Sequence, residues 1–173
     1  MKLNAFIIRS ELEKYNAELF GKEEYLGVCA YDVYGIDPSL WKKDVIKLEG
    51  DRDSSLPLLI KKDAAEDGCI NLIYNSSCET EDVLASLKNV FRKYDAWESE
   101  LNSVLMRGGS LDEYLNSSYG ILENSLSVCD GNSRYLALAG TENLPAKYKY
   151  VKDLEFIEPK MLETPEDFTE IAS

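Results

Sequence analysis

Residues 80–107 read TEDVLASLKNVFRKYDAWESELNSVLMR, and apolar side chains recur along them at alternating spacings of four and three residues. This spacing is typical of a helix that presents one apolar stripe, as in a coiled coil. The stripe, which we call the apolar seam, consists of Val83, Leu87, Val90, Tyr94, Trp97, Leu101 and Val104. The stretch therefore predicts a long helix that connects the segments on either side of it.

The apolar seam can be covered in two ways, by a second copy of the chain or by the chain's own domains. Leu84, Phe91 and Leu105 widen the apolar face beyond a strict two-stranded seam, which favours some packing within the chain. Lys93 and Glu98 lie where they would pair across a parallel dimer. We predict a parallel homodimer through this helix, and packing against the chain's own domains is the alternative.

Capping signals define the ends of this helix and the start of the next one. Thr80 is the expected N-cap, followed by two carboxylates in the first turn, where they suit the positive end of the helix dipole. The two glycines at 108–109 end the helix and form a candidate hinge. Ser110, with Glu113 three residues later, is a capping-box pattern that begins a second helix, which runs to Leu122.

The segment before the long helix predicts a small mixed α/β module over residues 1–79. Residues 3–19 mix apolar and charged positions and predict an opening helix that ends near Gly21. Four short apolar runs, separated by turn-forming residues, then predict strands at 25–31, 45–48, 58–60 and 70–74. Because these runs are almost continuously apolar, we expect the middle of the sheet to be covered on both faces.

The segment after the long helix, residues 108–173, predicts the start of a second sheet module. Residues 126–130 and 135–139 flank the turn-forming sequence Gly-Asn-Ser-Arg, which is typical of a β-hairpin. Residues 164–167 read Thr-Pro-Glu-Asp, a helix-start signal shortly before the last residue. We therefore expect the chain to be the front part of a longer protein. The predicted fold class is α+β or α/β, in three parts: 1–79, 80–107 and 108–173.

Composition excludes several partners and compartments. The 173 residues carry a formal net charge of -13, so the surface should repel polyphosphates, and we expect no direct binding of nucleic acid. No stretch is apolar for long enough to cross a membrane, and the N-terminus lacks the pattern of a signal peptide, so we expect a cytoplasmic protein. The four cysteines are far apart in sequence and read as reduced core thiols.

The sequence offers little that could carry catalysis. It contains no histidine, and histidine is the commonest general base and transition-metal ligand. Asp51-Arg52-Asp53 has too few ligands at regular spacing for a calcium loop, and no glycine-rich phosphate loop follows a strand. Tyr94 and Trp97 could stack on a planar ligand, but aromatic residues at heptad positions are usually core or dimer contacts. We expect a protein that is not an enzyme and holds no metal or cofactor.

One segment of the long helix has a distinctive pattern, Phe-x-x-Tyr-x-x-Trp-Glu, within LKNVFRKYDAWESEL at residues 87–101. This segment resembles the linker helix of bacterial transcriptional regulators of the purine catabolism regulator (PucR) type. Downstream, GSLDEYL at 109–115, LSVCD at 126–130 and LALA at 136–139 resemble the entry into their PAS- or GAF-like sensor domain. Upstream, CINLIY at 69–74 is similar to part of their N-terminal module. The resemblance covers about residues 25–140.

The resemblance implies a sensory and dimerising half of such a regulator. Members of the family read DNA with a C-terminal helix-turn-helix, and this chain has no counterpart to it. We therefore expect the ligand-sensing or dimerising regulatory part of a cytoplasmic bacterial transcriptional regulator, with a small-molecule effector as a candidate ligand. The alternative is a stand-alone protein–protein interaction module that uses its acidic surface and binds no small molecule.

Overall fold

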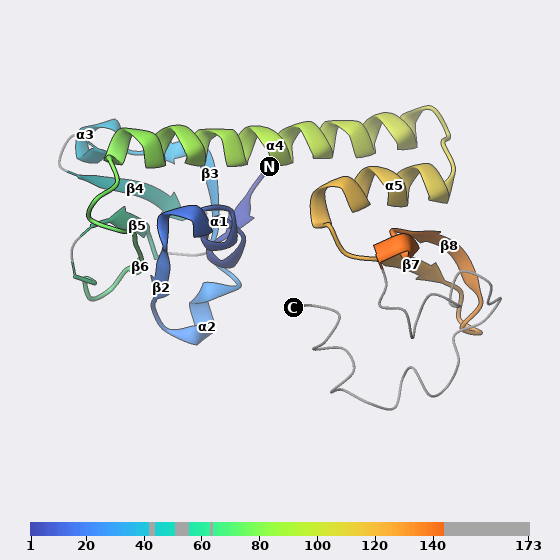
Figure 1. The fold of residues 1–173 in the computed structure, drawn as a ribbon, viewed down its shortest axis with the longest axis horizontal. Coiled ribbons are helices and arrows are strands. Elements are labelled where there is room, and N and C mark those ends of the chain that lie inside the picture. Colours follow the sequence, from blue (N-terminus) through green and yellow to red (C-terminus); the bar gives the residue numbers. More distant parts are fainter. Residues whose placement is uncertain (42–43, 51–55, 63, 144–173) are drawn as a thin grey trace. The chain divides into compact units, whose positions relative to one another are not determined.

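The structure is a computed structural model that describes residues 1–41, 44–50, 56–62 and 64–143. Its fold is mixed α+β and divides into two compact units, Met1–Asp95 and Ala96–Ser173. The boundary between the two units falls inside the longest helix, α4 (Thr80–Met106), which is continuous through it (Figure 1). The long helix predicted for residues 80–107 is thus confirmed to within one residue, and its two halves belong to different units.

The first unit is built on a six-stranded sheet in the order β1-β3-β4-β5-β6-β2. All neighbouring strands are antiparallel except β5 and β6, which are parallel. The strands are β1 (Leu3–Asn4), β2 (Glu18–Phe20), β3 (Ala30–Ile36), β4 (Val45–Gly50), β5 (Leu58–Lys61) and β6 (Ile70–Ile73). The shorter helical elements are α1 (Ala5–Glu11), η1 (Glu13–Tyr15), α2 (Glu23–Leu26) and α3 (Pro38–Trp41).

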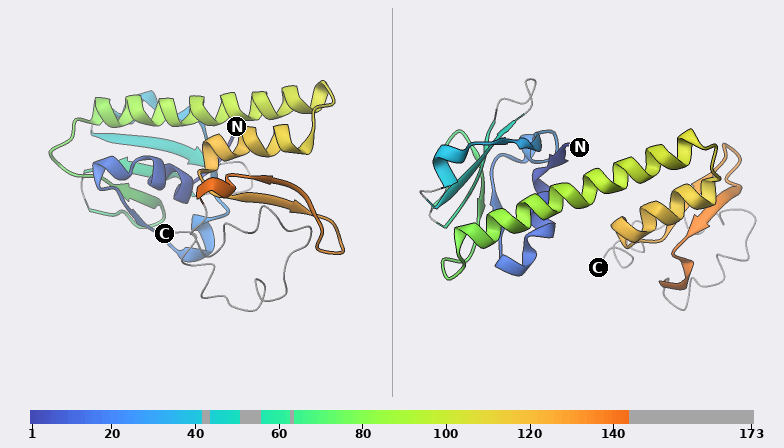
Figure 2. Two further views of the ribbon diagram at one scale, coloured as in Figure 1. Left: turned by 45° about the vertical axis from the view of Figure 1, so that its right-hand side comes forward. Right: turned by 90° about the horizontal axis from the view of Figure 1, so that it is seen from above.

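One face of this sheet forms the core of the first unit. The strand register places Ile46, Ile60 and Leu72 in one row, and all three side chains are fully buried. Side chains alternate between the two faces of a strand, so the next row on the same face lies two residues along and is also fully buried: Leu48, Leu58 and Ile70. Helix α1 and the first half of α4, which belong to the first unit, lie beside its sheet in both views of Figure 2 and contribute buried residues to the core.

The other face of the central strands is covered as well, which confirms the prediction of a sheet buried on both sides in its middle. Asn71 on β6 is buried, and its side-chain amide makes two hydrogen bonds with the backbone of Glu66, which lies in the β5–β6 connection. Nδ2 donates to the Glu66 carbonyl at 2.9 Å, and Oδ1 accepts from the Glu66 N–H at 3.0 Å. The buried ammonium of Lys61 pairs with the Glu66 carboxylate at 2.5 Å. The connection therefore closes over this face.

The N-terminal segment differs from the prediction. Instead of one helix over residues 3–19, the chain forms a short strand, the helix α1, one 3-10 turn and a second short strand. The run at 25–31 is not one strand either, because a helical turn ends at Leu26 and β3 begins at Ala30. The strands predicted at 45–48, 58–60 and 70–74 are confirmed as β4, β5 and β6.

The second unit contains the end of α4, helix α5 (Leu111–Leu122), the hairpin strands β7 (Leu126–Cys129) and β8 (Tyr135–Ala139), and a 3-10 turn, η2 (Thr141–Asn143). Its core consists of Leu115, Ala137 and Ala139, with the partly buried Tyr119 and Leu126 packed against them. A side chain at Gly140 would collide with the Tyr119 ring. The hairpin prediction is confirmed; the helix-start signal at residues 164–167 lies outside the described residues.

Candidate functional site

The apolar seam of α4 is the candidate site, and the structure buries most of it within a single chain. Val83, Leu87, Val90 and Tyr94 belong to the first unit, and none of them is more than 7% exposed. Val104, in the second unit, is also buried, whereas Trp97 and Leu101 are partly buried. The sequence left open whether the seam faces a second copy or the chain's own domains; over its first half, it packs within the chain.

The residues that widen the seam behave differently along the helix. Leu84 and Phe91 are buried with the seam in the first unit, while Leu105 is 62% exposed and its neighbour Met106 is 89% exposed. Since side chains that are already buried in one chain cannot contact another copy, any second copy has to meet α4 on its remaining surface.

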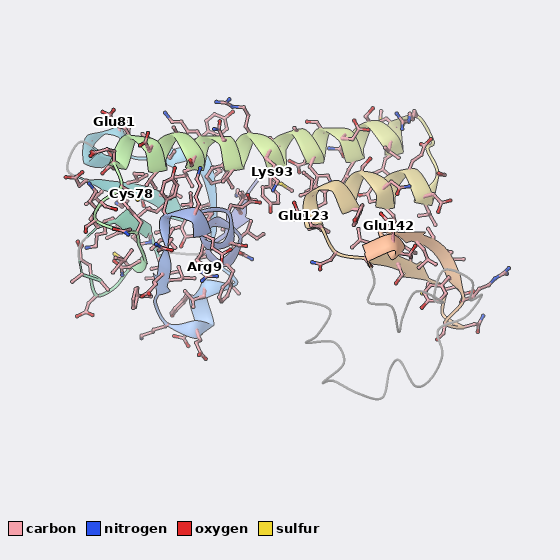
Figure 3. The ribbon with its side chains drawn as sticks, viewed as in Figure 1. Arg9, Cys78, Glu81, Lys93, Glu123 and Glu142 are labelled. Carbon is pink, nitrogen blue, oxygen red and sulfur yellow. The ribbon has the colours of Figure 1, made fainter. Side chains whose placement is uncertain are left out.

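A carboxylate on α1 contacts the turn of α4 that lies just before the boundary between the two units. Glu11 Oε1 accepts hydrogen bonds from Lys93 Nζ at 2.6 Å and from the Tyr94 hydroxyl at 3.0 Å. Lys93, labelled in Figure 3, also lies over the Tyr94 ring, 5.5 Å from its centroid. The sequence predicted a partner for Lys93 at Glu98 of a second copy, but within this chain the partner is Glu11. We call these three residues the Glu11 clamp.

The Glu11 clamp makes the phenol of Tyr94 less acidic. Burial first, and then the hydrogen bond to Glu11 and the negative charge of that carboxylate, together raise the pKa of Tyr94 from 10.0 to about 12. Tyr94 is therefore neutral at physiological pH and acts as a hydrogen-bond donor. This heptad aromatic is a core and docking residue, and its hydroxyl is directed to a carboxylate.

A second polar contact holds α4 two turns earlier. The Tyr15 hydroxyl, from η1, lies 2.7 Å from Ser86 Oγ and 3.1 Å from the Asp82 carbonyl oxygen. Ser86 and Lys93 are seven residues apart, so they lie on the same side of the helix. The segment from α1 to η1 therefore contacts α4 at two points on one side.

The start of α4 is fixed by a chain of hydroxyl groups. Tyr74 at the end of β6 and Thr80 are both buried, and their hydroxyls lie 2.7 Å apart. Thr80 Oγ1 donates to Asp44 Oδ1 at 2.6 Å, and this hydrogen bond, followed by the Lys62 ammonium 3.7 Å away, lowers the pKa of Asp44. The expectation that Thr80 is the N-cap is wrong, because Thr80 is the first residue of α4 and its hydroxyl donates instead to Asp44, the residue before β4.

The end of α4 is a Schellman motif. The Gly109 N–H donates to the Val104 carbonyl at 2.8 Å, the Gly108 N–H donates to the Leu105 carbonyl at 3.1 Å, and Gly108 has φ of +69°. Ser110 then caps α5, accepting from the Glu113 N–H at 3.2 Å, as its capping-box pattern predicted. The two glycines thus form an ordered turn with defined hydrogen bonds.

The remaining residues considered for chemistry stay apart in the described part of the chain. No group of three or more Cys, Asp or Glu side chains there could hold a metal ion, and Asp51-Arg52-Asp53 lies outside the described residues. No helix in the described ranges is both long enough and apolar enough to cross a membrane.

Comparison with known proteins gives no match: no protein-family model, curated protein or solved structure is significantly similar to this chain. The class of protein therefore has to be argued from the fold and from α4. Among the residues that matter there, Glu11 was missed by sequence reasoning. An acidic residue in a short helix usually indicates a solvated position, and no local pattern links Glu11 to a helix 82 residues away.

Proposed function

We propose that this chain is the regulatory part of a cytoplasmic bacterial transcriptional regulator of the PucR type, and that it senses a small molecule, dimerises, or does both. In this proposal the chain is not an enzyme and does not itself bind DNA. The observation that carries the proposal is α4: one unbroken helix whose residues 80–95 pack into one compact unit and whose residues 96–106 belong to the next. A continuous helix of this kind can pass a change in one unit to the other as a discrete shift in packing.

Two further observations support the proposal. The Phe-x-x-Tyr-x-x-Trp-Glu pattern at residues 91–98 resembles the linker helix of that family, and it lies across the boundary between the two units. The net charge of -13 argues against a direct contact with DNA phosphates, which agrees with a regulatory part that does not itself read DNA.

Sensing is tested by thermal unfolding of the chain with xanthine, uric acid and allantoin as probes. A ligand that binds only the folded chain raises its stability by RT ln(1 + [L]/Kd), so we expect a concentration-dependent rise in melting temperature with at least one probe. Dimerisation is tested in parallel by light scattering at micromolar concentration. A chain that stays strictly monomeric and shows no thermal shift with any probe would contradict the proposal.

The alternative is an interaction module that binds a basic partner through its acidic surface. The specific observation in its favour is the same charge of -13, together with exposed acidic pairs such as Glu23-Glu24 and Glu66-Asp67. This alternative predicts no thermal shift with metabolites and binding to a cationic protein that weakens as salt rises. The two measurements therefore separate the candidates.

A further inference from the structure

Helix α1 is tied to both outer strands of the sheet. It lies between β1 and β2 in the chain, and these two strands are the opposite ends of the strand order. At its start, Asn4 of β1 caps the helix, with Oδ1 accepting from the Ile7 N–H at 2.9 Å. Near its end, Arg9 Nε donates at 3.3 Å to the carbonyl of Ala17, the residue before β2. A movement of either edge of the sheet therefore displaces α1.

The same segment holds α4 at two points. Tyr15 contacts Ser86, and Glu11 contacts Lys93 and Tyr94, one heptad further along the helix. Two contacts on one side of a helix, about 10 Å apart at 1.5 Å per residue, fix both its rotation and its translation. The second contact lies in the last turn of α4 before the boundary at Asp95.

The Glu11 clamp is well suited to pass on such a displacement. The Glu11 side chain is 22% exposed, and a single oxygen accepts both hydrogen bonds, so a small movement of Glu11 changes both contacts together. Hydrogen bonds to a charged group are stronger than neutral ones, particularly where water is partly excluded. Because helix α4 continues without a break, a change at Lys93 and Tyr94 alters the support of the turns that follow.

We propose that the Glu11 clamp is the regulatory coupling element of the chain: it makes the order of α4 beyond Asp95 depend on the edge strands of the first unit. The proposal rests on the proposed function, since it names the contact through which a change in the first unit reaches the linker helix. Glu11 acts through Lys93 and Tyr94 and is a positioning residue.

The test is Glu11→Gln in the full chain, compared with Glu13→Gln. Gln keeps the size of the side chain and removes the charge, whereas Glu13 is an exposed acid two residues further on. Hydrogen exchange is measured by mass spectrometry on peptides covering residues 88–95 and 96–106. We expect exchange on the order of tenfold faster in both peptides for Glu11→Gln, and exchange like that of the unmodified chain for Glu13→Gln.

A second readout reports on the contact itself. The carboxylate of Glu11 contributes to the raised pKa of Tyr94, so Glu11→Gln should lower that pKa, measured from the ring carbon chemical shifts of Tyr94. Lys93→Met removes the other ion-pair partner and should give the same change in exchange. An unchanged pKa of Tyr94, or faster exchange confined to residues 88–95, would overturn the proposal.

The two proposals fail separately. The exchange experiment uses no ligand and no partner, so a chain without an effector can still show the coupling. Conversely, a chain that binds a metabolite can show no effect of Glu11→Gln beyond Asp95, in which case the coupling is refuted and the regulatory function stands.

Discussion

At the residue scale, Asn71 shows how one buried polar side chain can decide a local structure. Parallel strands need a crossover connection, and the connection between β5 and β6 is short. Asn71 secures it, because its amide satisfies both backbone groups of Glu66 and also reaches the Cys69 carbonyl at 3.3 Å. A buried amide that makes all these bonds stabilises the fold, and one that loses them destabilises it.

We predict that Asn71→Ala lowers the free energy of unfolding by about 1–3 kcal/mol, because it removes three hydrogen bonds to the β5–β6 connection. Urea denaturation measures the change. Asn89→Ala is the matched control: Asn89 is exposed on α4, and its replacement should alter stability by less than about 0.5 kcal/mol. Equal effects of the two substitutions would show that Asn71 does not hold the connection.

Tyr94 gives a prediction about alkaline pH. Its pKa is 10.0 in an unfolded chain and about 12 in the folded one, so between these values the folded chain keeps a proton that the unfolded chain has lost. The stabilisation is complete below about pH 10 and is lost as pH rises towards about 12. Tyr94→Phe should therefore lose stability less steeply above about pH 10. The control is Tyr34→Phe, at a 93% exposed site, which should lose stability with rising pH as steeply as the unmodified chain does. If the stability of Tyr94→Phe fell equally steeply, the prediction would be refuted.

Residues such as Thr80 and Glu11 also mark the limit of sequence reasoning at this scale. Thr80 precedes two acids and an apolar run, which is the usual pattern of an N-cap, yet its hydroxyl donates to Asp44, 36 residues earlier in the chain. Glu11 likewise finds its partners far along the chain. Local patterns encode capping and periodicity, but the choice of a distant polar partner depends on how the elements pack.

At the element scale, agreement with the sequence is best where the elements have strong local signals. Helix α4 has an apolar repeat that continues over many residues and clear end signals. Strands β4 to β6 are densely apolar runs, and the β7–β8 hairpin has a clear turn sequence. The strands β1 and β2 were missed because they are two and three residues long, and they exist through pairing with β3 and β6. Their strand identity comes from tertiary contacts, which override local propensity.

The turn at the end of α4 can be tested by comparing two glycines, one that needs a positive φ and one that lies in an ordinary helix. Gly108 has φ of +69°, a conformation that L-residues reach only at a cost, so Gly108→Ala should destabilise the second unit by about 1 kcal/mol. Gly120 lies within α5, and an added Cβ there meets nothing within 4 Å. Gly120→Ala should therefore stabilise by about 0.5–1 kcal/mol.

Thermal unfolding, followed by circular dichroism, measures both changes. A lowered melting temperature for Gly108→Ala together with a raised one for Gly120→Ala would support the Schellman turn as a fixed element. If Gly108→Ala were neutral, the turn would have to be able to adopt a different backbone conformation, as expected for a free hinge.

At the scale of the whole molecule, the boundary inside α4 connects fold and proposed function. The sequence divided the chain into a module, a linker helix and a second module, whereas the structure assigns each half of the helix to the unit beside it. Helix α4 contributes several buried side chains to the first unit and the buried Val104 to the second, so it is not a passive spacer, because its position affects the packing of both. The buried seam residues are thus used for folding, whereas Trp97 and Leu101 are only partly buried, so the proposed dimer would have to meet α4 on its remaining surface.

The net charge gives the last prediction, which concerns the proposed homodimer. Two copies with a charge of -13 each repel one another, and raising the salt from about 0.01 M to about 0.1 M shortens the Debye length from about 30 Å to about 10 Å. The dimer fraction, measured by sedimentation at micromolar concentration, should therefore rise with salt. Replacing the exposed Glu23 and Glu24 of α2 by Lys reduces the repulsion without changing α4, so it should favour the dimer at low salt. A dimer that dissociates as salt rises would instead depend on intermolecular ion pairs, contrary to a contact through apolar surface of α4.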